Sequence, residues 1–420
     1  MHHFFRQRHP SGLGGVHLST LAFVCLVALF VLPWILLAIR PHHHHEVDET
    51  GVGNAVVDAG QEVRSGSFGK LVLTPIVISP VDRALPPGWS RPAPATWFFP
   101  GYDAQKMDDL IASLEIDDTL RHALADREHW SVAGEGLQIK PSVETIFALP
   151  PGARDTLYQI LSRDPRNQAY RHPWSLETSN FESSLTDAAL TRETRDLIRR
   201  VAYTNQSRVF VSDVNAVVSS IEDESEKLRA VRFLKSASTY LVQLSFNEAS
   251  DIDTLISYWA RHRSVHETRP ILESLDITSA SIDITHVLAP FARRRIYTYP
   301  DPQAADDGVR RDCHWSSLNF FAVNPDDQLG NTAFVQEYVL EHYYQTSDEP
   351  VYGDIIFFTT PDGQTVHSAV YLAAGLAFTK NGDNEHQPWI IMDLDDIRDL
   401  YTAFSHAPTN PQTWRKKGGA

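Results

Sequence analysis

The sequence contains only two cysteines, Cys25 and Cys313, among its 420 residues. Cys25 lies in a long apolar run near the N-terminus and Cys313 lies far along the polar part of the chain, so they cannot pair within one molecule. A disulfide framework of the kind that stabilises small secreted domains is therefore excluded. A lone thiol is either buried and inert or retained for its reactivity, and this question applies to Cys313.

Positive charge is scarce, because 37 Lys and Arg stand against 53 Asp and Glu and the formal net charge is -16. No segment of the polar part gathers enough basic residues to follow a phosphate backbone, so we expect no nucleic-acid partner. The spacings His-Glu-x-x-His and Cys-x-x-Cys are missing, and the run from His42 to His45 has no carboxylate or cysteine partner at ligand spacing. We therefore expect no metal and no other cofactor.

Charged residues are missing from Leu21 to Ile39. Together with residues 16–20, this run is long enough to cross a hydrocarbon core of about 30 Å as a helix. Two arginines precede the run and acidic residues follow it, which favours a cytoplasmic N-terminus and an exported remainder. A cleaved signal peptide is the alternative, but its apolar region is normally only about 7 to 15 residues and ends in small residues. We expect an uncleaved signal anchor in a single-pass membrane protein whose bulk is periplasmic or extracellular, with a cytoplasmic tail over 1–15 and a transmembrane helix over 16–40.

Repeats of fixed period are also missing. The next two parts of the chain differ in the spacing of their apolar residues. Residues 41–70 have little apolar periodicity and are expected to form a linker. Residues 71–290 have mostly helical spacing, as between Met107 and Leu114, where apolar residues recur behind the good N-cap residue Asp103. A longer helix is expected from Glu222 to Leu244, because its start is acidic and its continuation basic. This region carries no catalytic motif, and its protein partner stays unidentified.

From about residue 291 the pattern changes to short apolar runs separated by glycines. These runs predict a compact antiparallel sheet with strands at Asp354–Thr359, His367–Leu372 and Leu376–Thr379. Two helices are expected before the sheet, over 315–321 and 331–344, so helices precede strands in a domain over 291–410. The expected fold class is α+β, with a mainly helical middle region and one N-terminal transmembrane helix before the C-terminal domain.

Three residues of this domain form a candidate catalytic site. Cys313 lies where irregular polar sequence gives way to helical spacing, and the unpaired N–H groups at a helix start favour the thiolate, the form that attacks carbonyl carbon. His367 begins the second predicted strand, where an imidazole can accept the thiol proton and later protonate a leaving amine. Asn381 follows the next predicted strand and is the candidate that orients the imidazole.

The order of these motifs resembles the NlpC/P60 superfamily of papain-like thiol hydrolases over roughly residues 295–405. The motifs are Asp312-Cys313 before a helix, Gly-Asp-Ile-Ile-Phe-Phe at 353–358, and His-Ser-Ala-Val-Tyr-Leu at 367–372. The resemblance implies a papain-like fold, Cys313 as nucleophile and His367 as base. It also implies cleavage of amide bonds in peptidoglycan peptides of the cell wall, typically next to D-amino acids.

The chain departs from the family pattern at three places. His314 and Trp315 follow the cysteine where the family usually has Ser-Gly. Thr379 stands where a third histidine is often found, so Asn381 is taken as its substitute. The tyrosine that often helps to hold the oxyanion corresponds to either Tyr299 or Tyr297.

We therefore predict a membrane-anchored, exported cysteine peptidase or amidase that acts on peptidoglycan peptides or another peptide substrate. A papain-like acyltransferase or transglutaminase-like enzyme is one alternative, because it would use the same Cys and His with an amine or alcohol acceptor. The other alternative is a non-enzymatic envelope scaffold whose degenerate hydrolase domain has lost the activity. It remains open because a single cysteine before a helix is by itself more often a buried small hydrophobe than a nucleophile.

Overall fold

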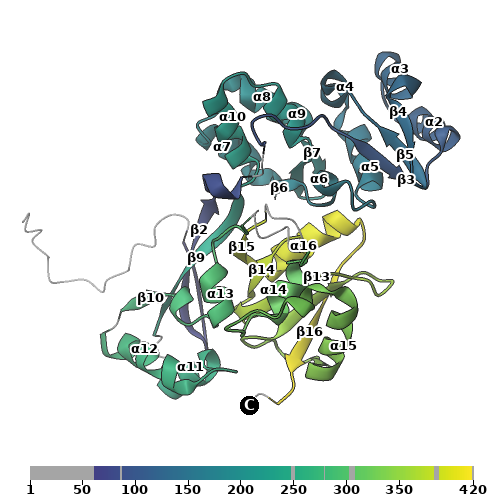
Figure 1. Cartoon of the computed structure of the whole chain (residues 1–420). Helices are drawn as coiled ribbons and strands as arrows, with labels where there is room; N and C mark the ends of the chain where they lie inside the picture. Colours follow the sequence, from purple (N-terminus) through teal and green to yellow (C-terminus); the bar gives the residue numbers. More distant parts are fainter. Residues whose placement is uncertain are drawn as a thin grey trace, which may run out of the picture. The chain divides into compact units, whose positions relative to one another are not determined.

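The computed structural model describes residues 61–418 except 86–87, 247–250, 279, 302–307 and 383–386 (Figure 1). The predicted cytoplasmic tail, transmembrane helix and first part of the linker lie outside the described residues. Among the helices that are described, none combines the length and apolar character needed to cross a membrane. The described chain is mixed α+β and carries four antiparallel sheets, which confirms the coarse fold class.

The first sheet has the strand order β1-β2-β9-β10. Its strands are β1 (Glu62–Gly66), β2 (Gly69–Ile78), β9 (Ala237–Ser245) and β10 (Ser281–Asp283). The predicted linker over 41–70 is therefore wrong in its last part, since β1 pairs with β2 along its whole length. Strand β1 carries little apolar sequence and is held by backbone pairing and by Arg64, whose guanidinium lies 2.6 Å from Asp393. Contacts of this kind join distant segments and do not require a regular spacing of apolar residues, so the strand could not be recognised in the sequence.

The helix predicted from Glu222 to Leu244 is wrong in its second half. Helix α10 spans Glu224–Phe233, and the chain then continues as β9, which pairs with β2 over all of its residues. In β9, Val242 and Leu244 are buried whereas Leu241 is exposed, the alternation of a strand. Leu241 and Leu244 have the spacing of one side of a helix, but in the strand they point to opposite faces, and it is the pairing with β2 that makes this segment a strand.

Much of the region between β2 and β9 is helical, but it also contains two three-stranded sheets that the sequence did not predict. The sheets have the orders β3-β5-β4 and β6-β8-β7. The strands are β3 (Trp97–Pro100), β4 (Trp130–Ala133), β5 (Gly136–Ile139), β6 (Trp174–Glu177), β7 (Tyr203–Asn205) and β8 (Arg208–Val211). The helices are α2 (Ala104–Ser113), α3 (Asp118–Ala125), α4 (Val143–Ala148), α5 (Pro151–Leu161), α6 (Gln168–Arg171), α7 (Thr178–Asp187), α8 (Arg192–Val201) and α9 (Val214–Ser219). The predicted N-cap is confirmed, because the Asp103 side chain accepts a hydrogen bond from the Lys106 amide at the start of α2.

The C-terminal part of the chain forms a six-stranded sheet of order β11-β16-β12-β13-β14-β15. Its strands are β11 (Tyr343–Thr346), β12 (Ile355–Thr359), β13 (Thr365–Ala373), β14 (Leu376–Lys380), β15 (Trp389–Asp393) and β16 (Asn410–Lys416). The helices from α11 onward are α11 (Ile252–Trp259), α12 (Val265–Thr278), α13 (Pro290–Arg295), α14 (Cys313–Leu318), α15 (Thr332–His342) and α16 (Leu394–Ser405). The three predicted strands and the presence of the two predicted helices are confirmed, but α14 begins and ends earlier than predicted, and residues 343–344 belong to β11. The predicted end at residue 410 is too early, because β16 continues to Lys416 and pairs with β12.

Helices cover both faces of this sheet (Figure 1). Along β13, Val370 and Leu372 belong to the same buried cluster as Trp315 of α14. Ala369, which alternates with them, packs instead in the cluster that contains Tyr401 of α16. Successive side chains of a strand point to opposite faces, so α14 lies on one face and α16 on the other. This arrangement decides where the candidate site residues point.

Candidate active site

Cys313 is the first residue of α14, as predicted, but its thiol is not poised as a thiolate. The N-cap residue Asp312 accepts a hydrogen bond from the Trp315 amide at 3.0 Å. Burial raises the pKa of the Cys313 thiol to about 12, and the negative charge of Asp312 adds to the increase. Hydrogen bonds from the amide and hydroxyl of Ser368 and the charge of Lys380 act in the opposite direction but do not prevail.

The expectation of a thiolate stabilised by the helix start is therefore not met. Helix α14 has only six residues, so few aligned peptide dipoles act on the sulfur. The side chain of Asp312 also occupies one of the free N–H groups at the helix start and places a negative charge beside the thiol. The loss of hydration on burial outweighs the remaining stabilisation of a thiolate by the helix start, so the resting thiol is neutral.

His367 lies on β13 and its imidazole is fully buried. The ring stacks on Tyr401 of α16, with 3.9 Å between centroids and 15° between planes. Its Nε2 lies 2.7 Å from the Thr379 hydroxyl on β14. The same hydroxyl donates to Asn381 Oδ1 at 3.3 Å, and the Asn381 amide donates to the sulfur of Met392 at 3.0 Å. His367, Thr379 and Asn381 thus form one hydrogen-bonded chain.

This chain fixes the position of the proton on the imidazole. A hydroxyl has one proton to donate, and Thr379 donates it to Asn381 Oδ1, which can only accept. With the Thr379 proton directed at Asn381 Oδ1, Thr379 accepts from His367, and this arrangement places the ring proton on Nε2 and a lone pair on Nδ1. Burial lowers the pKa of His367 well below its usual value, which keeps the ring neutral. Among the described residues, nothing donates to the buried Nδ1.

The structure does not join Cys313 to His367. In the described part of the chain no hydrogen bond links the two residues, and the polar groups acting on the sulfur are the amide and hydroxyl of Ser368. The Ser368 hydroxyl lies on the α14 side of the sheet, 2.8 Å from His314 Nδ1 and 3.1 Å from the Ser317 hydroxyl. The structure therefore brings His367 and Asn381 together through Thr379 and leaves Cys313 beside the residue that follows His367.

A cavity of about 390 Å³ lies over the thiol. Cys313 lines it, and so does Tyr401, the residue on which the His367 ring stacks. His172, from the loop after α6, closes another side of the cavity against Gly382. A Cβ atom on Gly382 would lie 2.9 Å from the His172 ring, and the positive φ of 95° also favours glycine there. The cavity therefore borders the buried Cys313 and is partly built by the middle region.

Neither tyrosine considered for the oxyanion is available for that role. The Tyr299 hydroxyl donates to the backbone carbonyls of Ile78 and Lys235. The Tyr297 hydroxyl donates to the carbonyl of Tyr240. Both hydroxyls are thus bonded to the backbone of the first sheet or its neighbouring segment, and neither residue lines the cavity over Cys313.

Sequence reasoning missed two contributors to this site. From the sequence, Thr379 was identified only as the residue that stands in place of a third histidine. Its position on the strand that follows His367 already indicated that the Thr379 hydroxyl could contact the His367 ring. Tyr401 had no signal, because only the packing of α16 on the sheet brings it to His367.

No group of three or more His, Cys, Asp or Glu residues within the described ranges is arranged to hold a metal ion. Comparisons of the chain with protein-family models, with curated proteins and with solved structures found no match.

Proposed function

We propose that this chain is a cysteine hydrolase with a papain-like C-terminal domain, in which Cys313 is the nucleophile and His367 the general base. The observation that carries the proposal is the buried, neutral His367 ring, with Nε2 bonded to Thr379 and Nδ1 without a donor among the described residues. A buried acceptor without a hydrogen bond costs about 1–3 kcal/mol, so it calls for an explanation. A base that must accept a proton during a reaction supplies one.

The proposed reaction begins from a neutral thiol and a neutral imidazole. The His367 ring packs on Tyr401 of α16, whereas Cys313 lies with Ser368 on the α14 side of the sheet, so the reaction requires these side chains to rearrange until the sulfur lies at hydrogen-bond distance of His367 Nδ1. His367 Nδ1 then takes the thiol proton as the sulfur attacks a peptide carbonyl carbon. The imidazolium then donates this proton to the leaving amine, and a thioester to Cys313 remains. Water, deprotonated by the neutral imidazole, hydrolyses the thioester and restores the thiol.

Thr379 and Asn381 are positioning residues in this scheme. Their hydrogen bonds keep the proton of the neutral ring on Nε2 and direct Nδ1 as the acceptor. The amide and hydroxyl of Ser368, which lower the pKa of Cys313, stabilise negative charge that develops on the sulfur. This is general-base activation at the moment of attack, because burial opposes a thiolate at rest.

The substrate class and location are part of the proposal. The NlpC/P60-like motifs around Cys313 and His367 support amide bonds of peptidoglycan peptides as the substrate. The apolar run over 16–40 supports a membrane anchor with the hydrolase domain outside the cytoplasm. The cavity of about 390 Å³ over the thiol supports access by a peptide segment.

A non-enzymatic scaffold is the second candidate, and the environment of the thiol favours it. Burial raises the pKa of Cys313 to about 12, and no hydrogen bond to His367 within the described residues offsets this. A cysteine of that kind is a small apolar core residue. The domain would then hold a partner without cleaving it.

Hydrolysis of peptidoglycan peptides by the full-length protein in detergent separates the candidates. We expect wild-type activity to disappear in Cys313→Ala and in His367→Asn, and to persist in His342→Asn, whose histidine lies on α15 outside the site. Full activity of Cys313→Ala would refute the hydrolase proposal, and folded wild-type protein without activity would favour the scaffold. Adding an amine tests the transferase alternative, which predicts an amide product in place of the free acid.

A further inference from the structure

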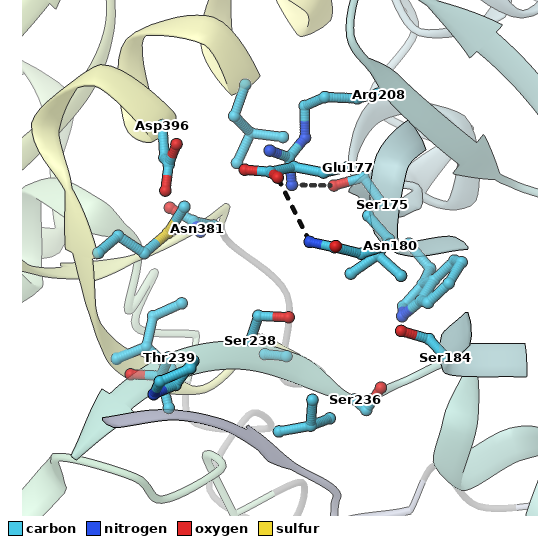
Figure 2. Close-up of a pocket in the computed structure, with 18 of the residues that line it drawn as sticks. Ser175, Glu177, Asn180, Ser184, Arg208, Ser236, Ser238, Thr239, Asn381 and Asp396 are labelled. Carbon is cyan, nitrogen blue, oxygen red and sulfur yellow. Dashed lines mark hydrogen bonds between the residues drawn. The ribbon is translucent and has the colours of Figure 1, made fainter. Parts of the chain in front are cut away.

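A second cavity, of about 490 Å³, lies between the middle region and the C-terminal sheet (Figure 2). Its polar lining combines hydroxyls and amides with three charged side chains. The labelled side chains are Ser175, Glu177, Asn180, Ser184, Arg208, Ser236, Ser238, Thr239, Asn381 and Asp396. Asn381 lines this cavity and also belongs to the group of hydrogen-bonded residues that includes His367 and Thr379. Nothing in the proposed hydrolysis uses the other residues.

Arg208 is the unusual group in this cavity. It lies on β8, and only 9% of the residue is exposed. Its guanidinium makes one long hydrogen bond, 3.5 Å from Nη2 to the Ser175 hydroxyl, while its Nε is buried without an acceptor among the described residues. No ion pair to Arg208 is found within the described residues, and burial lowers its pKa although the charges of Asp396, Glu177 and Asp399 act in the opposite direction. A buried guanidinium without a direct ion pair is costly even with carboxylates nearby, so the Arg208 side chain has room for an acceptor that a ligand can supply.

Another buried arginine shows what a structural role looks like in this protein. Arg154 is fully buried, and its guanidinium lies 2.6 Å from Asp213. It also donates to the Tyr158 hydroxyl and to the backbone carbonyls of Ile146 and Leu149. The Nε of Arg154 also lacks an acceptor among the described residues, but both of its Nη atoms are bonded by groups of the fold, which include a carboxylate. In the described part of the chain, Arg208 has no such ion pair.

Two carboxylates enter the same cavity from different elements. Glu177 ends β6 and accepts a hydrogen bond of 3.4 Å from the Asn180 amide, whereas Asp396 projects from the first turn of α16 (Figure 2). Burial raises the pKa of Asp396 to about 6, and the neighbouring charge of Glu177 contributes to the increase. The Asp396 side chain is half-buried in this cavity.

We propose that this cavity binds an α-amino acid group, with its carboxylate on Arg208 and its ammonium on Glu177 and Asp396. A ligand with only an anionic group would leave two carboxylates facing it. A ligand with only a cationic group would leave Arg208 unpaired. A carbon that carries both charges satisfies all three side chains, and the surrounding hydroxyls can bond the remaining polar atoms.

The proposal does not depend on cleavage by Cys313, so the two can fail separately. Should both hold, the cavity places a free amino acid group of a peptide beside Asn381. A neighbouring cavity of about 500 Å³ shares Trp174, Ser175 and Ser236 with the first, which leaves room for a ligand larger than a single amino acid.

Binding to the full-length protein in detergent tests the proposal, with leucine, lysine and glutamate in both D and L forms as probes. Each is compared by calorimetry and saturation-transfer NMR with its N-acetyl derivative, which lacks the ammonium, and with its α-amide, which lacks the carboxylate. We expect at least one free amino acid to bind ten times more tightly than both of its derivatives. Equal affinity of a derivative, or no binding of any free amino acid at millimolar concentration, would overturn the proposal.

Variants then identify the groups that hold the ligand. We expect Arg208→Met and Asp396→Asn each to weaken binding at least tenfold, and Arg199→Met, an exposed arginine on α8, to leave it unchanged. Because Arg208 lacks an ion pair in the described structure, Arg208→Met should keep the thermal unfolding midpoint or raise it. A lower midpoint with unchanged affinity would show that Arg208 is a structural residue and would refute the assignment.

Discussion

Replacing Thr379 by valine removes one hydroxyl from the hydrogen-bonded chain of the candidate site and keeps the shape of the side chain. The change leaves two buried polar groups without a partner, the Nε2–H of His367 and Oδ1 of Asn381. An unsatisfied buried group costs about 1–3 kcal/mol, so for the two groups together we expect the free energy of unfolding to fall by about 2–6 kcal/mol. Without its acceptor, the ring can also carry its proton on Nδ1, and that tautomer cannot act as the base.

General-base catalysis contributes about 10²- to 10⁴-fold, so we expect kcat for amide hydrolysis by Thr379→Val to fall about 10²-fold. The matched control is Thr379→Ser, which retains the hydroxyl and should stay close to wild type in both measurements. Nitrogen chemical shifts of His367 report the tautomer directly and should show Nε2–H in the wild type and in Thr379→Ser. The reasoning is refuted if valine and serine at this position give the same kcat and the same stability.

Three further perturbations test the environment described above. Because burial raises the pKa of Cys313 to about 12, alkylation by iodoacetamide should be slow at neutral pH and accelerate up to about that pH; a plateau below the ordinary thiol value of about 8.5 would contradict this. Gly382→Ala should lower the unfolding midpoint more than Gly363→Ala, since both have positive φ but only Gly382 meets the His172 ring; equal losses would exclude the close approach. Arg154→Met, which leaves Asp213 buried without its partner, should cost about 3–5 kcal/mol in denaturant unfolding, and a loss below about 1 kcal/mol would contradict the pairing.

The C-terminal domain was predictable because its signals are local. The apolar run of β12 and the glycine turns at Gly363 and Gly375 separate the strands in the sequence itself. Asp103 is a helix cap whose hydrogen bond spans three residues, so the short-range pattern was sufficient to predict it.

Other features depend on contacts between distant segments, which the sequence does not display. Leu241 and Leu244 fit a helical stripe, and only pairing with β2 makes that segment a strand. The pKa of Cys313 follows from its burial, which outweighs the start of a six-residue helix. Arg208 carries no motif, and its unpaired state is visible only once β8 and its surroundings are folded.

The proposed covalent step is accessible to one measurement, the intact mass of the full-length protein mixed rapidly with a peptidoglycan peptide. We predict a transient increase equal to the mass of the acyl fragment, mapped by peptide digestion to Cys313 and lost in Cys313→Ala. Hydrolysis of the peptide at the wild-type rate by Cys313→Ala, without any adduct, would contradict the assignment of this thiol as the nucleophile.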